Sequence, residues 1–596
     1  MQQKKLSIHS ENILPIIKKW LYSDKDIFLR ELVSNACDAL NKVKILTGEE
    51  PGSISIRIDK AAKTISITDT GIGMTAEEVE KYIAQIAFSG AEEFAEKYKA
   101  QTEKDPIIGH FGLGFYSAYM VASKVEIDTR SYTDAPAAFW SCDGTSSYSM
   151  DTGKREARGT EITLHIDEES LEYLEESKLK ELLNRHCKFL PYPIELNGQP
   201  IGNLAPLWMK SPTDCTDKEY LEFYRALFPM DPEPIFWIHL NVDYPFNLKG
   251  ILYFPKMHRR FDAKESTIKL FCNRVFVSDN CKDILPDYLT ILRGAIDSPD
   301  IPLNVSRSYL QVDKNVKQLS SHISKKVSDR LATLYRTDRQ KFIDSWSDIE
   351  MIVKLGALQD AKFFERIRDL LIWENGENTW TTTAEYLERN PGGKVLYAAE
   401  DRSAALVSLY KEKKIEFLYS HSYIDTALIS LLEDKHACKF QRLDGQLGDE
   451  LLDASREKNI FDAEGKTESA RIAEFIQRSL NNTEVEVEAK SLVSDELPGL
   501  LVLNEEERRF RDYMTLTQGK EIPNFLSKKT FVVNTNNKLI QTLLKLEKKQ
   551  PEIATDLARH LYDLSRLSAR ELDAEETEAA LSKQTAILGK LAELLP

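Results

Sequence analysis

Three polar residues, Glu31, Asn35 and Asp38, stand at helical spacing in a segment whose other residues are mostly apolar. Positions i, i+4 and i+7 share one face of an α-helix, so this face carries a carboxylate, an amide and a second carboxylate. Burying such a stripe costs free energy unless it meets a ligand, a metal or hydrogen-bonding partners. The stripe therefore predicts a binding or catalytic site on a helix within residues 10–47.

A first glycine-rich segment, Asp69-Thr-Gly-Ile-Gly73, follows an alternating apolar segment that is typical of a strand. A carboxylate at a strand end, beside glycines that let a ligand approach the backbone, suits hydrogen bonding to an exocyclic amine such as N6 of adenine. Met74 would then pack on the base. Taken alone, the segment fits a plain Asp-Thr-Gly turn equally well.

A second glycine-rich segment, Gly109 to Gly114, has the pattern GxxGxG and precedes a segment, 115–122, that we expect to be helical. Backbone amides and the positive end of a helix would here face phosphates. The segment lacks the GK[ST] of a Walker loop, and the dinucleotide-binding fingerprint needs a strand directly before it. Alone the pattern is weak, but the order of the three segments is specific and predicts a nucleotide site.

The elements expected around these segments give a mixed α+β sandwich over residues 1–198, with one sheet and helices on one face. Alternating segments at 53–59 and 63–70 predict a hairpin. Residues 76–100 have a helical pattern. The remaining strands are expected at 124–130, 137–143 and 160–166.

The rest of the chain predicts further mixed units. Strands are expected near 234–241, 247–254 and 267–277, then helices to about 345, then short strands among helices over 346–460. After a helix at 467–481 and two further strands, the chain ends in a long helical tail with apolar residues at helical spacing. Such a terminal helix is most often a dimerisation or domain-packing element.

Composition limits the classes of function. The 596 residues exceed one hydrophobic core, and the net charge of −16 disfavours a broad nucleic-acid-binding surface. No apolar run reaches the roughly 18 residues that span a bilayer, and the first residues do not resemble a secretory signal. The seven cysteines form no CxxC pair, which fits a reducing compartment. We therefore expect a cytoplasmic protein that binds neither nucleic acid nor a membrane.

The three segments together resemble the ATP site shared by type II topoisomerases, histidine kinases, MutL proteins and the ninety-kilodalton heat-shock chaperones. Within that superfamily, the sequence is most similar to the chaperones. The similarity is carried by the segments DIFLRELVSNACDAL, DTGIGMT, IGHFGLGFYSAYMVASKV and RGTEITLHI. The resemblance continues through PLWMKSPTD, KGILYFPK and residues 268–311, and it thins over 346–596. The absence of a charged linker favours the bacterial branch of that family.

The resemblance implies an ATP-dependent chaperone that closes as a homodimeric clamp around unfolded or partly folded clients, with other chaperones as further partners. It implies an N-terminal ATP-binding domain (1–198) with a lid at about 85–114, a short linker (199–205), a middle domain (206–465) and a C-terminal dimerisation domain (466–596).

The resemblance also assigns roles at the site. Glu31 would activate the attacking water, Asn35 would bind Mg²⁺, and Asp38 would orient the site. Arg307 and Gln311, from the middle domain, would complete catalysis as an arginine finger does. The remaining ATP-binding residues implied are Asp69, Gly73, Met74, Gly112, Gly114, Phe115 and Thr160.

Three positions depart from the family pattern: Phe88 replaces a usual basic residue, Tyr82 a common asparagine and His110 a usual glutamine. These changes put one phosphate contact in doubt. The change at Phe88 keeps open one alternative, a nucleotide-binding scaffold with little turnover. The other alternative is a DNA-processing ATPase of the same superfamily, which the net charge and the resemblance over 206–311 disfavour.

Overall fold

The structure is a computed structural model, and the residues it describes form two compact units, Met1–Arg330 and Leu331–Pro596. Each unit is described by itself below. The described residues are 24–50, 52–85, 94, 98, 108–109, 112–145, 147–202, 204–244, 246–256, 267–279, 284–301, 314–399, 404–445, 447–456, 467–503, 509, 529–569 and 571–592.

The first unit begins with an eight-stranded mixed sheet in the order β5-β4-β3-β6-β2-β1-β7-β8. Most neighbouring strands are antiparallel, and β1 pairs with β7 in parallel. The strands are β1 (Ile54–Asp59), β2 (Thr64–Asp69), β3 (Ala122–Arg130), β4 (Ala138–Cys142), β5 (Tyr148–Thr152), β6 (Gly159–Ile166), β7 (Ile194–Leu196) and β8 (Gln199–Ile201).

The predicted hairpin is confirmed: β1 and β2 pair antiparallel, with Asp59 opposite Thr64. The turn between them is held by Asp59, whose carboxylate accepts hydrogen bonds from the amides of Ala61 and Ala62 at 2.9 Å each. Lys63 closes the turn with a φ of 53°. A short Asx-type turn therefore explains why the hairpin forms at this place in the chain.

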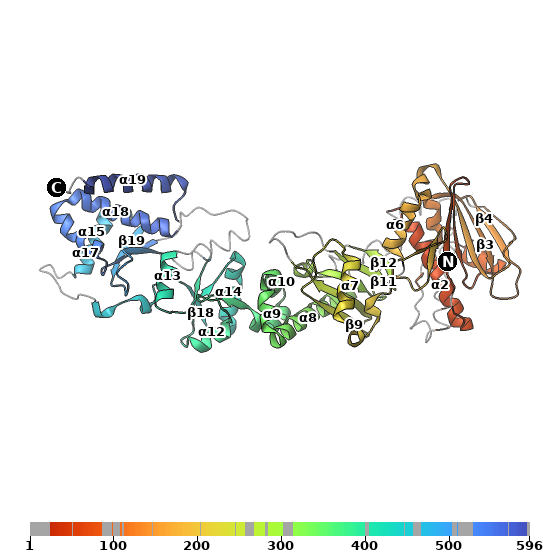
Figure 1. Cartoon of the computed structure of the whole chain (residues 1–596), viewed down its shortest axis with the longest axis horizontal. Helices are drawn as coiled ribbons and strands as arrows, with labels where there is room; N and C mark the ends of the chain where they lie inside the picture. The colour runs from red at the N-terminus through yellow and green to blue at the C-terminus, as the bar shows by residue number, and fades with distance from the viewer. Residues whose placement is uncertain are drawn as a thin grey trace, which may run out of the picture. The chain divides into compact units, whose positions relative to one another are not determined.

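Helices cover one face of this sheet, as predicted, and Figure 1 shows α2 and α6 on the same side of it. Helix α2 is capped by Gly48, whose φ of 69° lets its amide donate to the carbonyl of Lys44. One buried core joins α2, the 3-10 helix η3 and α6 to the inward side chains of the sheet. The helices of this part are α2 (Ile27–Thr47), α3 (Ala76–Tyr82), η3 (Gly114–Met120), η4 (Glu168–Leu174) and α6 (Glu176–His186).

The helix expected at 115–122 needs correction. The segment is a 3-10 helix that begins at Gly114 and ends at Met120, and Ala122 already belongs to β3. The tighter winding fits the short distance to the strand, and the Ser117 hydroxyl donates back to the Gly114 carbonyl at 2.6 Å.

A second sheet in the first unit has the order β12-β11-β13-β10-β9. The single strand expected at 267–277 is in fact the hairpin β11–β12, because Asn273 and Arg274 both have positive φ and turn the chain. The elements are α7 (Asp217–Leu227), α8 (Lys314–Thr337, which continues into the second unit), β9 (Phe236–Val242), β10 (Leu248–Phe254), β11 (Thr267–Cys272), β12 (Val275–Ser278), β13 (Arg293–Asp297), and the 3-10 turns η5 (Leu207–Met209), η6 (Pro212–Asp214) and η7 (Asp287–Leu289).

The second unit contains a two-stranded hairpin and two three-stranded sheets in the orders β17-β16-β18 and β19-β21-β20. The strands are β14 (Ile372–Glu374), β15 (Trp380–Thr382), β16 (Lys394–Ala398), β17 (Leu418–Tyr419), β18 (Lys439–Arg442), β19 (Val485–Lys490), β20 (Gly499–Leu503) and β21 (Lys529–Asn534).

Helices surround these sheets, and the predicted terminal helical tail is confirmed as α17 to α19. They are α9 (Arg339–Asp344), α10 (Trp346–Gln359), α11 (Ala361–Ile367), α12 (Thr383–Arg389), α13 (Ala404–Glu412), α14 (Tyr423–His436), α15 (Glu468–Leu480), α17 (Lys538–Lys549), α18 (Pro551–Ser568) and α19 (Ala574–Ala592), with 3-10 turns η8 (Arg368–Leu370), η9 (Asp449–Leu451) and η10 (Ala454–Arg456). Among the described residues, no helix is both long enough and apolar enough to cross a membrane.

Candidate nucleotide site

The polar stripe of the sequence lies on α2, and its two carboxylates are buried. Glu31 and Asp38 are each 6% exposed, and Asn35 is half-buried. The neighbouring Arg30, also buried, donates to Oε1 of Glu31 from Nε at 3.1 Å and from Nη2 at 2.8 Å. The Arg30 guanidinium therefore compensates the buried Glu31 charge and fixes its orientation.

Asp38 binds the start of the second glycine-rich segment. Its Oδ1 accepts a hydrogen bond from the amide of Ile108, and its Oδ2 accepts one from the amide of Gly109, both at 2.7 Å. A Cβ on Gly109 would lie 3.2 Å from Asp38 Oδ2 and 3.4 Å from Asn35 Oδ1. The segment thus approaches the stripe closely at a position where glycine leaves room.

Gly114, at the other end of the same segment, lies against Glu31. A Cβ on Gly114 would come within 2.8 Å of Glu31 Oε2. Oε1 is held by Arg30, so the two oxygens of Glu31 have different neighbours. Gly112 has a φ of 62°, a conformation that glycine adopts without strain. The stripe and the GxxGxG segment therefore form one site, as their order in the sequence predicts.

The first glycine-rich segment also contacts α2. The Ile72 amide donates to the carbonyl of Ala39 at 3.1 Å, and a Cβ on Gly71 would lie 2.5 Å from the Ala39 Cβ. The Gly71 amide donates to Asp69 Oδ1 at 2.7 Å. Both glycine-rich segments are therefore packed on the same helix.

Asp69 is 5% exposed at the end of β2, and burial raises its pKa to about 7. The amide of Gly71 lowers that pKa, but less than desolvation raises it. A buried acceptor of this kind is suited to a ligand that brings a hydrogen-bond donor.

A row of three polar side chains crosses the sheet at this point. Asp69 on β2 stands opposite Thr160 on β6, and Thr160 stands opposite Thr129 on β3. Directly opposite residues point to the same face. The row is flanked by Ile54 on β1 and Ala138 on β4, both buried and apolar. We call Asp69, Thr160 and Thr129 the polar row.

The residues after Asp69 are held against this row. The Met74 amide donates to the Thr129 hydroxyl at 3.0 Å, and Met74 packs at the edge of the core. Gly73 has a φ of 63°, and a Cβ there would lie 1.8 Å from the carbonyl oxygen of Arg130. Only glycine fits at this position, because both the backbone conformation and the contact exclude a side chain.

Phe115 lies in the core rather than at the surface of the site. Its ring packs edge to face on Trp140 with centroids 5.7 Å apart. Any contact of Phe115 with a ligand would therefore come from its backbone. Arg307, Gln311, Phe88 and His110, and most of the predicted lid, lie outside the described residues. Tyr82 ends α3, with the Lys81 ammonium 5.0 Å from its ring.

Sequence reasoning missed Arg30 and Thr129. Thr129 carries a usable signal: Val125 and Ile127 are inward on β3, so alternation places Thr129 inward as well. A polar residue at an inward strand position is unusual unless it has a function. Arg30 has no such signal, because an arginine at its position is expected on an exposed helix face.

The thiol of Cys37 takes no part in this chemistry. It is fully buried between site residues, and burial raises its pKa well above the ordinary value. The thiol therefore stays protonated and packs as a small apolar group.

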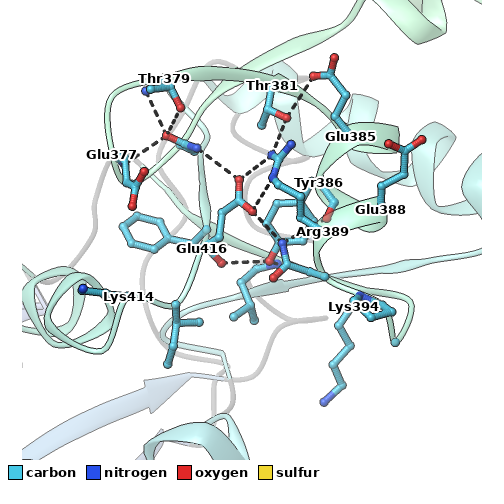
Figure 2. A pocket seen from close by; sticks show the side chains of 18 of the residues that line it. Glu377, Thr379, Thr381, Glu385, Tyr386, Glu388, Arg389, Lys394, Lys414 and Glu416 are labelled. Atoms are coloured by element: carbon cyan, nitrogen blue, oxygen red, sulfur yellow. Dashed lines mark hydrogen bonds and ion pairs between the residues drawn. The ribbon is translucent and has the colours of Figure 1, made fainter.

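A separate cavity of about 1200 Å³ lies in the second unit, beside the β14–β15 hairpin and α12. Figure 2 shows Arg389 and Glu416 paired at its centre, at 2.7 Å, with Thr381 beside them. Glu416 also accepts bonds from Asn375 and Asn390.

A second ion pair lines the same cavity. Arg339 binds both oxygens of Glu385, at 2.6 and 2.7 Å, and its guanidinium lowers the pKa of that carboxyl to about 2. These central carboxylates are paired within the protein and form a structural network. Glycines also line this cavity, but the carboxylates of Glu416 and Glu385 are already bound by arginines, so the site on α2 is the better candidate for a ligand.

Comparison with known proteins defines the class first. Residues 24–179 match the family described as histidine kinase-, DNA gyrase B-, and HSP90-like ATPase. The site on α2 lies within this match, so the first unit contains an ATPase domain of that class.

Residues 199–590 match the family described as Hsp90 protein. The chain is 42% identical over 612 residues to a chaperone protein HtpG of Porphyromonas gingivalis, which covers 96% of this chain and 88% of that protein. It is 40% identical to one of Bacteroides thetaiotaomicron (93% and 86% covered) and 30% identical to one of Geobacter sulfurreducens (95% of each). The chain belongs to the Hsp90 family.

The expectations of an ATPase and of an ATP-dependent molecular chaperone are confirmed at the level of this family. The expected α+β multidomain fold is confirmed as well. Because the match beyond the ATPase domain is to Hsp90, it favours the chaperone over a DNA-processing ATPase.

Proposed function

We propose that the chain is a homodimeric clamp that binds and hydrolyses ATP on α2 and uses this reaction to close around client proteins. The observation that carries the proposal is the packing of both glycine-rich segments on α2. Asp38 holds Ile108 and Gly109, and Gly114 lies against Glu31. One helix thereby brings together the carboxylates of Glu31 and Asp38, the side-chain amide of Asn35 and the backbone of two glycine-rich segments. Exposed glycine backbone amides are suited to binding the phosphates of a nucleotide.

Glu31 is the proposed catalytic residue. Its Oε1 is bonded to Arg30, and its Oε2 faces Gly114 of the glycine-rich segment. A carboxylate held in this way can position a water molecule for attack on the γ-phosphate and accept its proton. In phosphoryl transfer, positioning and charge stabilisation supply most of the rate enhancement, so one fixed carboxylate is sufficient on this side.

Asn35 is the proposed ligand of Mg²⁺. Its amide oxygen lies close to where a side chain on Gly109 would stand, and no partner of the Asn35 side chain is found among the described residues. A neutral oxygen donor in half-buried surroundings fits an ion that keeps several waters and takes only one or two protein ligands. When bound, the ion would neutralise charge on the phosphate oxygens.

Asp69, Met74 and Thr160 are proposed to hold the base, with Gly73 providing the turn on which Met74 sits. Asp69 would accept a hydrogen bond from the adenine amine, with Thr160 beside it. Gly112, Gly114 and the backbone of Phe115 would surround the phosphates. Arg307 and Gln311 would complete the site from the middle domain, so that hydrolysis requires the domains to dock.

We propose the domain boundaries expected from the sequence: an ATP-binding domain (1–198), a middle domain (206–465) and a C-terminal domain (466–596). The last of these would form the dimer, a proposal supported by Leu581 and Leu588, which are 51% and 59% exposed on α19. We propose unfolded or partly folded proteins as clients, other chaperones as partners and the cytoplasm as the location.

The test is ATP turnover by wild type and Glu31→Ala, together with suppression of aggregation of a heat-denatured protein. We expect Glu31→Ala to bind ATP normally and to lose hydrolysis, while Glu80→Ala, an exposed carboxylate on α3, behaves as wild type. Hydrolysis by Glu31→Ala above roughly a tenth of wild type would exclude the catalytic role. A wild type that binds ATP without turnover would favour the scaffold alternative.

A further inference from the structure

The hydroxyl of Thr129 is fully buried and has three polar neighbours. The Met74 amide lies 3.0 Å away, the Gly159 carbonyl oxygen 3.2 Å and the Thr160 hydroxyl 2.9 Å. Thr129 is the least exposed residue of the polar row and has no access to solvent. Its hydroxyl therefore acts only through these three groups.

The directions of these hydrogen bonds follow from counting protons. An amide can only donate and a carbonyl can only accept, whereas a hydroxyl has one proton and two lone pairs. If Thr129 donates to Gly159, its two lone pairs accept from Met74 and from Thr160, and three bonds form. If Thr129 donates to Thr160 instead, only two bonds form. The arrangement with three bonds is favoured, because a buried polar group left unpaired costs free energy.

In the favoured arrangement Thr160 uses its only proton toward Thr129. The free side of the Thr160 hydroxyl then carries lone pairs alone. When Asp69, next in the row, is ionised, its carboxylate also has only acceptor oxygens. Two acceptors side by side match an exocyclic amine, which has two N–H donors, and repel the carbonyl oxygen that a 6-oxopurine has at the same place.

We propose that Thr129 is a positioning residue that sets the hydrogen-bond direction of Thr160 and thereby selects 6-aminopurine over 6-oxopurine nucleotides. The proposal rests on the proposed base-binding role of Asp69 and Thr160. Thr129 does not touch the nucleotide, and it acts on the ligand through Thr160. It predicts a change in base selectivity with no change in the chemical step.

The experiment measures calorimetric affinities for ADP and GDP, and KM and kcat for ATP, in the full chain. Thr129→Val keeps the shape and removes the hydroxyl, and we expect it to lower the ADP-to-GDP preference roughly tenfold, the effect of one neutral hydrogen bond. KM for ATP should rise while kcat is unchanged. Thr129→Ser, which keeps the hydroxyl, should restore wild-type selectivity.

The matched control is Thr163→Val on β6, the strand beside β3, whose hydroxyl lies 3.2 Å from that of Ser66 on the other side of the sheet. It should leave selectivity unchanged. An unchanged preference in a folded Thr129→Val chain would overturn the proposal, as would an equal loss in Thr129→Ser. If Thr129→Val does not fold, Thr160→Val provides the test, since it should lower the same preference and an unchanged ratio would reject the proposal.

Asp69→Asn separates this proposal from the function on which it depends. If Asp69→Asn leaves ADP affinity unchanged, the proposed base site is wrong and the role of Thr129 fails with it. If Asp69→Asn removes ADP binding while Thr129→Val keeps its selectivity, the base site stands and only the role of Thr129 is wrong.

Discussion

The carboxylate of Asp38, on the central helix of the first unit, accepts a hydrogen bond at 2.7 Å from the amide of Gly109, 71 residues further along the chain. The other oxygen of Asp38 binds the preceding amide at the same distance. One side chain thus holds both amides at the start of the second glycine-rich segment. This relationship assigns Asp38 an orienting role in the proposed site.

Asp38→Ala should weaken nucleotide binding and lower the melting temperature of the first unit. The substitution leaves two amides without their acceptor, at about 1–3 kcal/mol each where they are buried. Calorimetry with ADP and thermal unfolding of the ligand-free chain measure both effects. Asp38→Asn keeps one acceptor oxygen and should be intermediate; equal ADP affinity in wild type and Asp38→Ala would show that the segment is held by other contacts.

Gly114→Ala should reduce turnover at saturating ATP by tenfold or more, an effect on the order of 1.4 kcal/mol. The added Cβ would come within 2.8 Å of Glu31 Oε2, so the carboxylate must move from the position that Arg30 fixes. Steady-state hydrolysis is the measurement. Gly202→Ala is the matched control, because nothing lies within 4 Å of its added Cβ. Full turnover by Gly114→Ala would mean that this geometry of Glu31 is not the catalytic one.

The stability of the nucleotide-free chain should fall as pH rises from 5 to 7, relative to Asp69→Asn. Burial raises the folded-state pKa of Asp69 to about 7 from 3.8, so the folded state binds this proton more tightly than the unfolded state. The stabilisation is complete below the unfolded pKa and is lost as pH rises through the folded one.

The expected slope is about 1.4 kcal/mol per pH unit below pH 7, levelling off above it. Urea unfolding of wild type and Asp69→Asn at several pH values provides the difference, which cancels groups common to both. Parallel curves for the two proteins would show that Asp69 titrates at an ordinary pKa.

Leu581→Glu combined with Leu588→Glu should convert the proposed dimer to a monomer. The two leucines are seven residues apart on α19, so they share a helix face, and both are more than half exposed. Light scattering should give about twice the chain mass of 68.1 kDa for wild type and 68.1 kDa for the variant. Met230→Glu, at a residue 93% exposed, should remain dimeric. A dimeric double variant would place the interface elsewhere.

The sequence predicted the α2 stripe and the β1–β2 hairpin because each depends on local spacing. It predicted that the glycine-rich segments join α2 from the order of the three segments along the chain. It did not predict β5, β13 or β21. The β5 segment is mostly exposed and has no alternating apolar pattern, so only its partner β4 defines it. Thr129 was missed for a related reason. Its role comes from Thr160 on β6, which pairs with β3, and from Met74 after β2, and both groups reach Thr129 only in the folded sheet.

The polar row and the apolar core of the first sheet depend on the same strand register. A slip of one residue would turn Asp69, Thr160 and Thr129 outward and bring their neighbours Thr68, Glu161 and Asp128 into the core. Two carboxylates would then be buried side by side, at a high cost in free energy. A mispaired sheet would therefore lose both its stability and the proposed base site at once, so that, on the proposed function, retention of a purine nucleotide is a direct assay of correct strand pairing in newly made or refolded chains.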